Sequence, residues 1–144
     1  MTDDAPPAPP TRMLPKLDDR NRALWTAGAD GRLLIAQCTR CALWVNPPAD
    51  DCPDCGGALQ PRPVSGHGTV FTFTVNYQPF HPAVPVPYVI AIIQLDEQDD
   101  LRIAANIVGC EPDSVAVGLP VEVRFERQDV DGRTAFVPVF VPRA

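Results

Sequence analysis

The stretch Cys38-Thr39-Arg40-Cys41, followed ten residues later by Cys52-Pro53-Asp54-Cys55, decides the fold. Two such Cys-x-x-Cys hooks can place four thiolates around one tetrahedral metal ion. Gly56-Gly57 follows the second hook, and small residues there let backbone amides turn toward the sulfurs. Residues 28–62 have too few apolar side chains for a core of their own, so a metal cross-link would supply the missing folding free energy.

Three kinds of cross-link fit four cysteines at this spacing. Structural zinc is favoured, because four cysteine ligands leave no open coordination position and make a closed, non-catalytic site. Iron in a rubredoxin-like electron carrier fits the same geometry, although nothing else in the sequence indicates a redox partner. Disulfides are the third alternative, and a cytoplasmic setting disfavours them. The fifth cysteine, Cys110, is interpreted as a small packing residue rather than a reactive nucleophile.

The sequence before the hooks predicts an arm and a short helix. Residues 1–17 are rich in proline and are expected to form an extended, mobile arm. Residues 18–27 are expected to be helical, with Asp18 as the cap and Gly28 at the end. Trp25 is the anchor of this helix, packed either on the body of the chain or on a ligand. Short strands are expected at 33–37 and 43–45, beside the first hook.

The C-terminal part alternates apolar and polar side chains in the manner of β-strands. Five strands are expected, at residues 69–77, 88–95, 101–108, 121–127 and 134–141. Phe71, Phe73, Val75 and Tyr77 are expected to face the core, and residues 88–95 to be buried on both faces. Residues 96–100 are expected to be a solvated hairpin tip, and 109–120 a loop with one helical turn.

These elements predict a mainly β protein with three segments. Five strands are too few for a two-sheet sandwich, whereas a closed barrel removes exposed edges, and the OB barrel has five strands. The expected order is the arm at 1–17, the helix and zinc ribbon at 18–62, and a five-stranded OB-fold barrel at 63–144.

Composition limits the classes of partner. Twelve basic against eighteen acidic residues give a net charge of −6, and the only lysine is Lys16. A general nucleic-acid binder would need a basic face, so nucleic acid is disfavoured as a partner. No stretch approaches the length of apolar residues that a membrane span requires. The N-terminus lacks an apolar signal core, and a cytoplasmic location is the expectation.

The sequence contains no recognisable set of catalytic residues that would make the chain an enzyme on its own. The two histidines, His67 and His81, lie in loops flanked by glycine or proline, and neither is favoured as a general base. There is no phosphate-cradling glycine motif, nucleophile elbow or paired-carboxylate motif. The sequence therefore predicts no catalytic residues.

The chain resembles the bacterial and archaeal proteins that join a rubredoxin-like zinc ribbon to a C-terminal OB-fold, a family known as a domain of unknown function. The resemblance covers about residues 18–142, and its elements occur in the family's order. The matching segments are Trp25 with Gly31-Arg32-Leu33, the two hooks, Ser65-Gly66-His67-Gly68-Thr69-Val70, Pro87-Tyr88-Val89, Leu95-Asp96, Asn106-Ile107-Val108-Gly109-Cys110 and Val117-Gly118-Leu119-Pro120-Val121.

The resemblance implies an accessory subunit of an acyl-CoA enzyme, because members of the family assemble with thiolases, thiolase-like aldolases or sterol-precursor synthases. The partner would hold the catalytic groups and make or break the carbon–carbon bond, while this chain supports assembly and acyl-CoA binding. The alternative function is single-stranded nucleic-acid binding, which zinc ribbons and OB barrels also perform.

Two sets of surface residues follow as candidates. Arginine suits the phosphates of CoA and indole suits its adenine, which singles out Trp25, Arg32, Arg40 and Trp44. The loop 78–87 contains four prolines, which restrict the free loop and reduce the entropy lost on docking. Its apolar side chains make it either a preorganised partner surface or only a stiff connection. The candidate partner contacts are Phe80, His81, Val84 and Val86.

Overall fold

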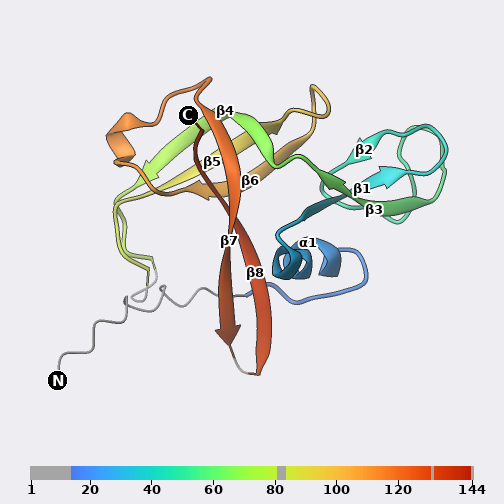
Figure 1. Ribbon diagram of the computed structural model, residues 1–144, viewed down its shortest axis with the longest axis horizontal. Helices are drawn as coiled ribbons and strands as arrows, with labels where there is room; N and C mark the ends of the chain where they lie inside the picture. Colours follow the sequence, from blue (N-terminus) through green and yellow to red (C-terminus); the bar gives the residue numbers. More distant parts are fainter. Residues whose placement is uncertain (1–13, 81–83, 131, 144) are drawn as a thin grey trace.

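A computed structural model of the protein describes residues 14–80, 84–130 and 132–143. The cysteine hooks lie at one end of a small antiparallel sheet with strand order β2-β1-β3. Its strands are β1 (Leu33–Cys38), β2 (Trp44–Val45) and β3 (Leu59–Val64), and they project to one side of the molecule (Figure 1). The β3 strand was not predicted, because two of its six residues are proline.

The second sheet closes on itself as a five-stranded barrel with the order β4-β5-β6-β8-β7. A short 3-10 turn, η2 (Pro112–Ser114), lies in the loop after β6, as predicted. The one parallel contact joins β6 to β8 through Ile107 and Phe140, which closes the barrel. The expected mainly β architecture with a closed five-stranded barrel is confirmed. The five strands are β4 (His67–Asn76), β5 (Tyr88–Leu95), β6 (Arg102–Ile107), β7 (Pro120–Val130) and β8 (Arg133–Pro142).

The N-terminal helix is shorter than predicted and lies beside β8, between the long β7–β8 hairpin and the ribbon (Figure 1). It comprises α1 (Arg22–Thr26) and a 3-10 turn, η1 (Ala27–Asp30). Asp18 accepts backbone hydrogen bonds in the turn before the helix and does not cap it. Gly28 does not end the helix either, because Gly31, with φ of +71°, takes that role. A side chain at Gly28 would clash with Phe125 and Phe136, so glycine permits the close approach of helix and hairpin.

The ribbon and the barrel share one hydrophobic core. Leu33, Ile35 and Val64 of the ribbon belong to the same buried cluster as Phe140, Val121 and other barrel residues. Leu33 and Phe140 are almost completely buried. Because burial of apolar surface is the main source of folding free energy, the inner end of the ribbon depends on the barrel for its stability.

The expected core face of β4 is wrong in part. A bulge between Val70 and Thr72 inserts Phe71 as an extra residue, so that Phe71 is 47% exposed while Val70 is buried. Tyr77, beyond the end of the strand, is 66% exposed. Phe73 and Val75 do pack against the core.

Strand β5 has the predicted bounds, but it is buried on one face only. Its buried residues alternate with more exposed ones, and Ile90 is 40% exposed. Alternation of this kind is normal where one face of an antiparallel sheet meets solvent. The other face of β5 therefore lies on the surface of the molecule.

The β5–β6 hairpin tip is bonded to the ribbon rather than simply solvated. The Gln98 side chain accepts a hydrogen bond from the Trp44 backbone N–H at 3.0 Å and donates one to the Trp44 carbonyl oxygen at 3.0 Å. Asn46 donates to the Arg102 carbonyl oxygen at 2.7 Å, and Glu97 accepts from the Ser65 backbone N–H at 2.7 Å. We call these contacts the clasp, because they tie β2 and the connection between β3 and β4 to the β5–β6 hairpin.

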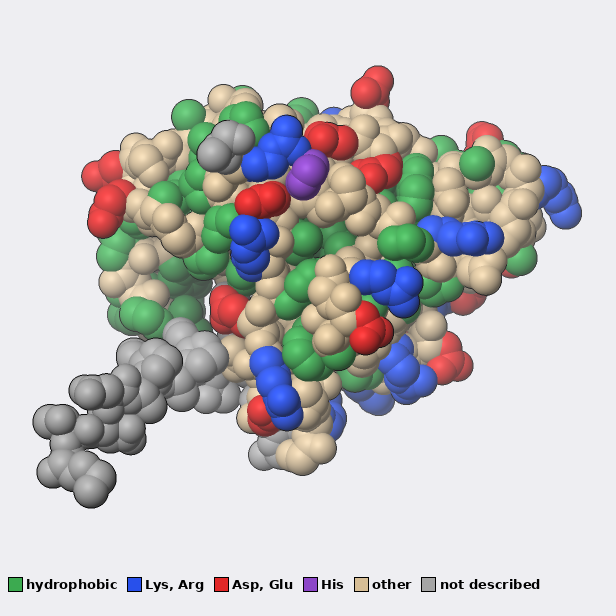
Figure 2. Space-filling view, viewed as in Figure 1, with side chains coloured by type: hydrophobic (Ala, Val, Ile, Leu, Met, Phe, Trp, Pro, Cys, Tyr) green, Lys and Arg blue, Asp and Glu red, His purple; other side chains and the backbone are tan. Residues whose placement is uncertain are grey.

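Charged side chains of both signs are interspersed over the face of the molecule in Figure 2. Several form ion pairs, including Arg20 with Asp50 and Arg124 with Glu122. The described residues include no helix with the length and apolar character needed to cross a membrane.

Candidate metal centre

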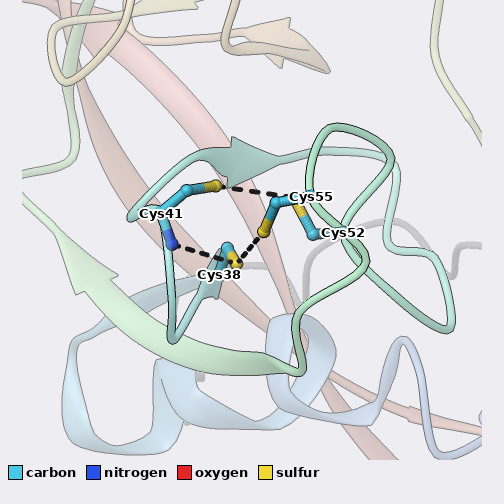
Figure 3. Close-up of side chains that lie close together, drawn as sticks. All are labelled: Cys38, Cys41, Cys52 and Cys55. Carbon is cyan, nitrogen blue, oxygen red and sulfur yellow. Dashed lines mark hydrogen bonds between the residues drawn. The ribbon is translucent and has the colours of Figure 1, made fainter.

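The four cysteines of the hooks converge at the outer end of the ribbon (Figure 3). Their sulfur atoms all lie within 4.8 Å of one another. The Sγ atoms of Cys38 and Cys55 are 3.4 Å apart, and those of Cys41 and Cys52 are 3.7 Å apart. All five cysteines of the chain are free, so the disulfide alternative has no support in the structure.

The backbone of the first hook folds around a sulfur. The N–H groups of Arg40 and Cys41 donate to Cys38 Sγ at 3.3 and 3.4 Å. The two hooks then turn in the same way: Ala42 follows the first with φ of +66°, and Gly56 follows the second with φ of +73°. The two N–H groups that donate to Cys38 Sγ favour its thiolate form over the thiol, because they stabilise negative charge on sulfur.

Gly57 forms the floor of the centre. A Cβ atom at this position would lie 2.9 Å from Cys38 Sγ, 3.0 Å from Arg40 Cβ and 3.3 Å from Cys55 Sγ. A side chain here would therefore displace the sulfurs. The small residue beside the second hook thus has a definite role, because Gly57 leaves the space that the sulfur cluster occupies.

The thiols differ in acidity. The backbone hydrogen bond from Cys41 contributes most to lowering the pKa of Cys38 to about 6. At Cys41 the Leu43 backbone hydrogen bond lowers the pKa, but hydrogen bonding to Cys55, desolvation and the other two thiols outweigh it and raise the pKa to about 12. The cluster without a metal thus favours a thiolate at Cys38 and a thiol at Cys41.

The geometry fits a tetrahedral tetrathiolate ion. Zinc–sulfur bonds of about 2.3 Å in a tetrahedron place the sulfurs about 3.8 Å apart, within the span of the observed separations. Four protein sulfurs fill the coordination sphere, so the centre suits a structural ion and has no position for a substrate. Cys38 and Cys52 are buried, which restricts solvent access to two of the ligands.

The four residues predicted to bind CoA lie on different elements of the N-terminal part of the chain. Trp25 lies on α1, Arg32 precedes β1, Arg40 lies in the first hook and Trp44 lies on β2. Arg40 donates to the Cys55 carbonyl oxygen at 3.4 Å. Trp44 packs against the core cluster. No hydrogen bond or ring contact between described residues joins these four side chains, and their role stays a prediction.

The predicted partner contacts lie near the β4–β5 connection. Phe80 is 78% exposed, Val86 is exposed, and Val84 lines a cavity of about 400 Å³ beside the barrel. His81 lies outside the described residues. Cys110 is partly buried, packs against the core and also lines this cavity, as expected of a packing residue.

Sequence reasoning missed Gln98 and Asn46, which hold the ribbon to the barrel. Neither lies in a motif, and the clasp joins positions 54 residues apart in the case of Gln98 and Trp44. The only signal was the position of Gln98 at a hairpin tip. Nothing local in the sequence shows that this tip faces another part of the chain.

A zinc ribbon joined to an OB-fold barrel defines the class of protein, and comparison with known proteins gives the family. Residues 25–60 match the family described as ChsH2, rubredoxin-like zinc ribbon domain, and residues 61–126 match ChsH2, C-terminal OB-fold domain. A "DUF35 domain-containing scaffold protein" of Methanocaldococcus jannaschii is 36% identical over 69% of this chain and 72% of its own length. The chain belongs to this DUF35 family.

Two further relatives are longer or assembled proteins. A "Probable enoyl-CoA hydratase alpha subunit" of Thermomonospora curvata is 34% identical over 86% of this chain, but the chain spans only 38% of that relative. A solved structure titled "Ltp2-ChsH2(DUF35) aldolase" is 31% identical, with a TM-score of 0.77, and the match covers 90% of this chain and 98% of that one. The predicted family and fold are therefore confirmed.

Proposed function

We propose that this protein is a non-catalytic accessory subunit of an acyl-CoA enzyme of the thiolase-like type, either a thiolase or an aldolase. Its zinc ribbon and barrel form a scaffold on which the partner enzyme assembles. The observation that carries the proposal is the likeness over almost the whole chain to a protein whose structure is titled an Ltp2-ChsH2 aldolase. The names "scaffold protein" and "hydratase alpha subunit" among the relatives support the same function.

The metal in this proposal is a structural zinc ion held by Cys38, Cys41, Cys52 and Cys55. Zinc would cross-link the two hooks and stabilise a region with little core of its own. The convergence of four sulfurs supports this assignment. Rubredoxin-type iron, the alternative left open by the sequence, would give a coloured protein, whereas a zinc protein is colourless.

Catalysis belongs to the partner in this proposal. Four cysteine ligands leave no open metal position. His67 Nε2 lies 3.9 Å from a Glu122 carboxylate oxygen, and both side chains are partly exposed. The Ser65 hydroxyl accepts a hydrogen bond from the His67 backbone N–H at 3.1 Å, and among the described residues no hydrogen bond joins it to the imidazole. Carbon–carbon bond cleavage or formation beside the thioester would use groups of the partner.

Direct contact with acyl-CoA by this chain is a finer proposal. Arg32 and Arg40 are exposed, and neither forms an ion pair with another described residue. Their guanidinium groups are thus available to the phosphates of a CoA molecule shared with the partner. Trp25 and Trp44 would supply aromatic surface for the adenine.

Co-expression tests the proposed function. The full chain is produced with a candidate partner, a thiolase-like acyl-CoA enzyme of the same organism, and the two are purified through a tag on one of them. We expect co-purification and higher thioester turnover than for the enzyme alone, with no turnover by this chain alone. A double variant, Cys52→Ser with Cys55→Ser, should lose zinc and the order of the ribbon, and its binding shows how far the complex depends on the ribbon. Turnover by the isolated chain, or no binding of the wild type, would refute the proposal.

A further inference from the structure

The outer face of strands β4, β5 and β6 is nearly uncharged. Arg102 is the only charged residue in β4 from Val70 onward, in β5 and in β6, whereas charged residues make up 21% of the chain. Strand register places its side chains in neighbouring rows. We use the name neutral face for the following outward residues of these strands: Phe71, Thr72, Thr74, Ile90, Ile92 and Ala104.

Phe71 is held outward on the neutral face by two features. The bulge in β4 turns it away from the core, while Val70 and Phe73 on either side keep their inward packing. The Arg102 guanidinium stacks on the Phe71 ring, 3.8 Å from its centroid, and Arg102 Nε donates to Gln94 Oε1 at 3.3 Å. Bulges commonly re-aim a side chain, and cation–π stacking restrains it. Phe71 is thus an exposed aromatic group that loses little conformational entropy on docking.

A hollow adjoins this face. Asn106, which stands opposite Ile90 in the sheet, and Tyr88, two residues before Ile90, both line the cavity of about 400 Å³. Pro85 and Pro87 form part of its wall. The hollow lies at the Tyr88 end of the face, whereas Phe71 lies at the end near Ile93, and Glu126 is among the residues that line the hollow. Exposed aromatic side chains such as Phe71 are common among the residues that contribute most to protein–protein binding.

We infer that the neutral face is where the partner enzyme docks, with Phe71 as the anchor and an uncharged, apolar surface as its complement. This inference rests on the proposed function and names the surface that performs it. Charge favours this occupant, because the single cation of the face is already stacked on Phe71 and a phosphate-rich partner would find no other. A second copy is disfavoured because each chain carries a net charge of −6.

Matched alanine variants test the inference. Ala104 lies on the neutral face opposite Ile92, and Ala29 lies on η1; both are exposed. Ala104→Glu and Ala29→Glu therefore make the same change of charge at two places. Phe71→Ser removes the anchor. The dissociation constant of each full-length variant is measured against the candidate partner enzyme by biolayer interferometry, with thermal unfolding as the check on folding.

We expect Ala104→Glu and Phe71→Ser each to weaken binding by about tenfold or more, and Ala29→Glu by less than about twofold. If all three variants bind like the wild type, the inference is wrong and the proposed function stands. If the wild type does not bind, both fail.

Two further measurements on the isolated chain identify other occupants. Sedimentation that shows a dimer abolished by Ala104→Glu would assign the face to a second copy. Binding of oligo(dT) that Phe71→Ser abolishes would assign it to single-stranded nucleic acid. Either result overturns the inference.

Discussion

At the scale of single residues, Ala42 and Gly56 occupy equivalent positions after the two hooks. Both have positive φ, which an L-residue with a Cβ atom adopts at a cost of about 1 kcal/mol. A Cβ atom at Gly56 would meet nothing within 4 Å, so only the backbone conformation matters there. The first hook thus contains a strained alanine where the second has an unstrained glycine.

Exchanging these two residues should have opposite effects. We expect Gly56→Ala to lower the free energy of unfolding of the zinc-loaded protein by about 1 kcal/mol, and Ala42→Gly to leave it unchanged or raise it slightly. Urea unfolding of the two variants and the wild type measures both changes. A loss of stability in Ala42→Gly as large as that in Gly56→Ala would contradict the equivalence of the hooks.

The different acidities of Cys38 and Cys41 predict how zinc binding depends on pH. Zinc binds thiolates, so Cys41, whose pKa of about 12 keeps it protonated at pH 7.5, must release its proton on binding. Each unit of acidification should therefore weaken zinc affinity by at least about tenfold. Below pH 6 the dependence should steepen, because Cys38, with a pKa of about 6, then also takes up a proton. Competition with a colorimetric chelator from pH 5 to 8 measures this, and a pH-independent affinity would contradict it.

The residue scale also shows what sequence can reveal about a site. The spacing of the cysteines predicted their convergence, because a Cys-x-x-Cys hook is a local geometry. The alternation of β4 misplaced Phe71, because one inserted residue shifts the pattern and the Arg102 contact that holds the ring comes from another strand. Local chemistry was predictable, whereas contacts between strands were not.

At the scale of elements, the clasp joins two parts whose sheets are separate. The Gln98 side chain forms hydrogen bonds with both the N–H and the carbonyl oxygen of Trp44. These are the hydrogen bonds that a neighbouring strand would otherwise make with the short β2 strand. On its other side, the ribbon ends in β3, whose edge contains Pro61 and Pro63. Proline lacks a backbone N–H and so discourages pairing with another chain.

Removing the Gln98 side chain should loosen the ribbon. We expect Gln98→Ala to reduce the free energy of unfolding by about 1–3 kcal/mol, because two backbone groups lose their partners. Asp99→Asn is the control, since Asp99 is exposed on the same hairpin and should change stability by less than about 0.5 kcal/mol. Urea unfolding followed by tryptophan fluorescence reports on both variants, and equal stabilities would exclude a stabilising clasp.

The sequence predicted strands correctly where the pattern of apolar side chains and the flanking turn residues define them. Strand β5 occurs at Tyr88–Leu95 as expected, because its apolar run is bounded by turn residues. The helix was predicted too long, since Asp18 and Gly28 are typical cap residues used here for a turn and for a close contact with Phe136. Strand β3 pairs with β1 despite its prolines, a result of tertiary context that propensity cannot show.

At the scale of the whole molecule, the shared core and the metal centre stabilise opposite ends of the ribbon. Leu33 and Ile35 anchor its inner end in the barrel core, whereas the cysteines lie at its outer end. The barrel has its own closed hydrogen-bonded sheet and does not need the metal. The molecule thus consists of a closed barrel and a ribbon whose two ends depend on the barrel core and on the metal centre.

Chelation should therefore unfold the ribbon first. We expect strong chelator to remove amide protection from residues 38–58 while strands β5 to β8 keep theirs, because only the hooks rely on zinc. Hydrogen exchange of the full chain with and without chelator measures this difference. Retained protection in the hooks would argue against a structural ion.

Native mass spectrometry of the full chain mixed with the candidate partner enzyme tests the central claim most directly, since one spectrum reports both metal and partner. The account predicts a complex of the two proteins with one zinc ion for each copy of this chain. A complex of the untreated wild-type chain that contains no zinc, or a zinc-loaded chain that remains alone at every concentration, would contradict it.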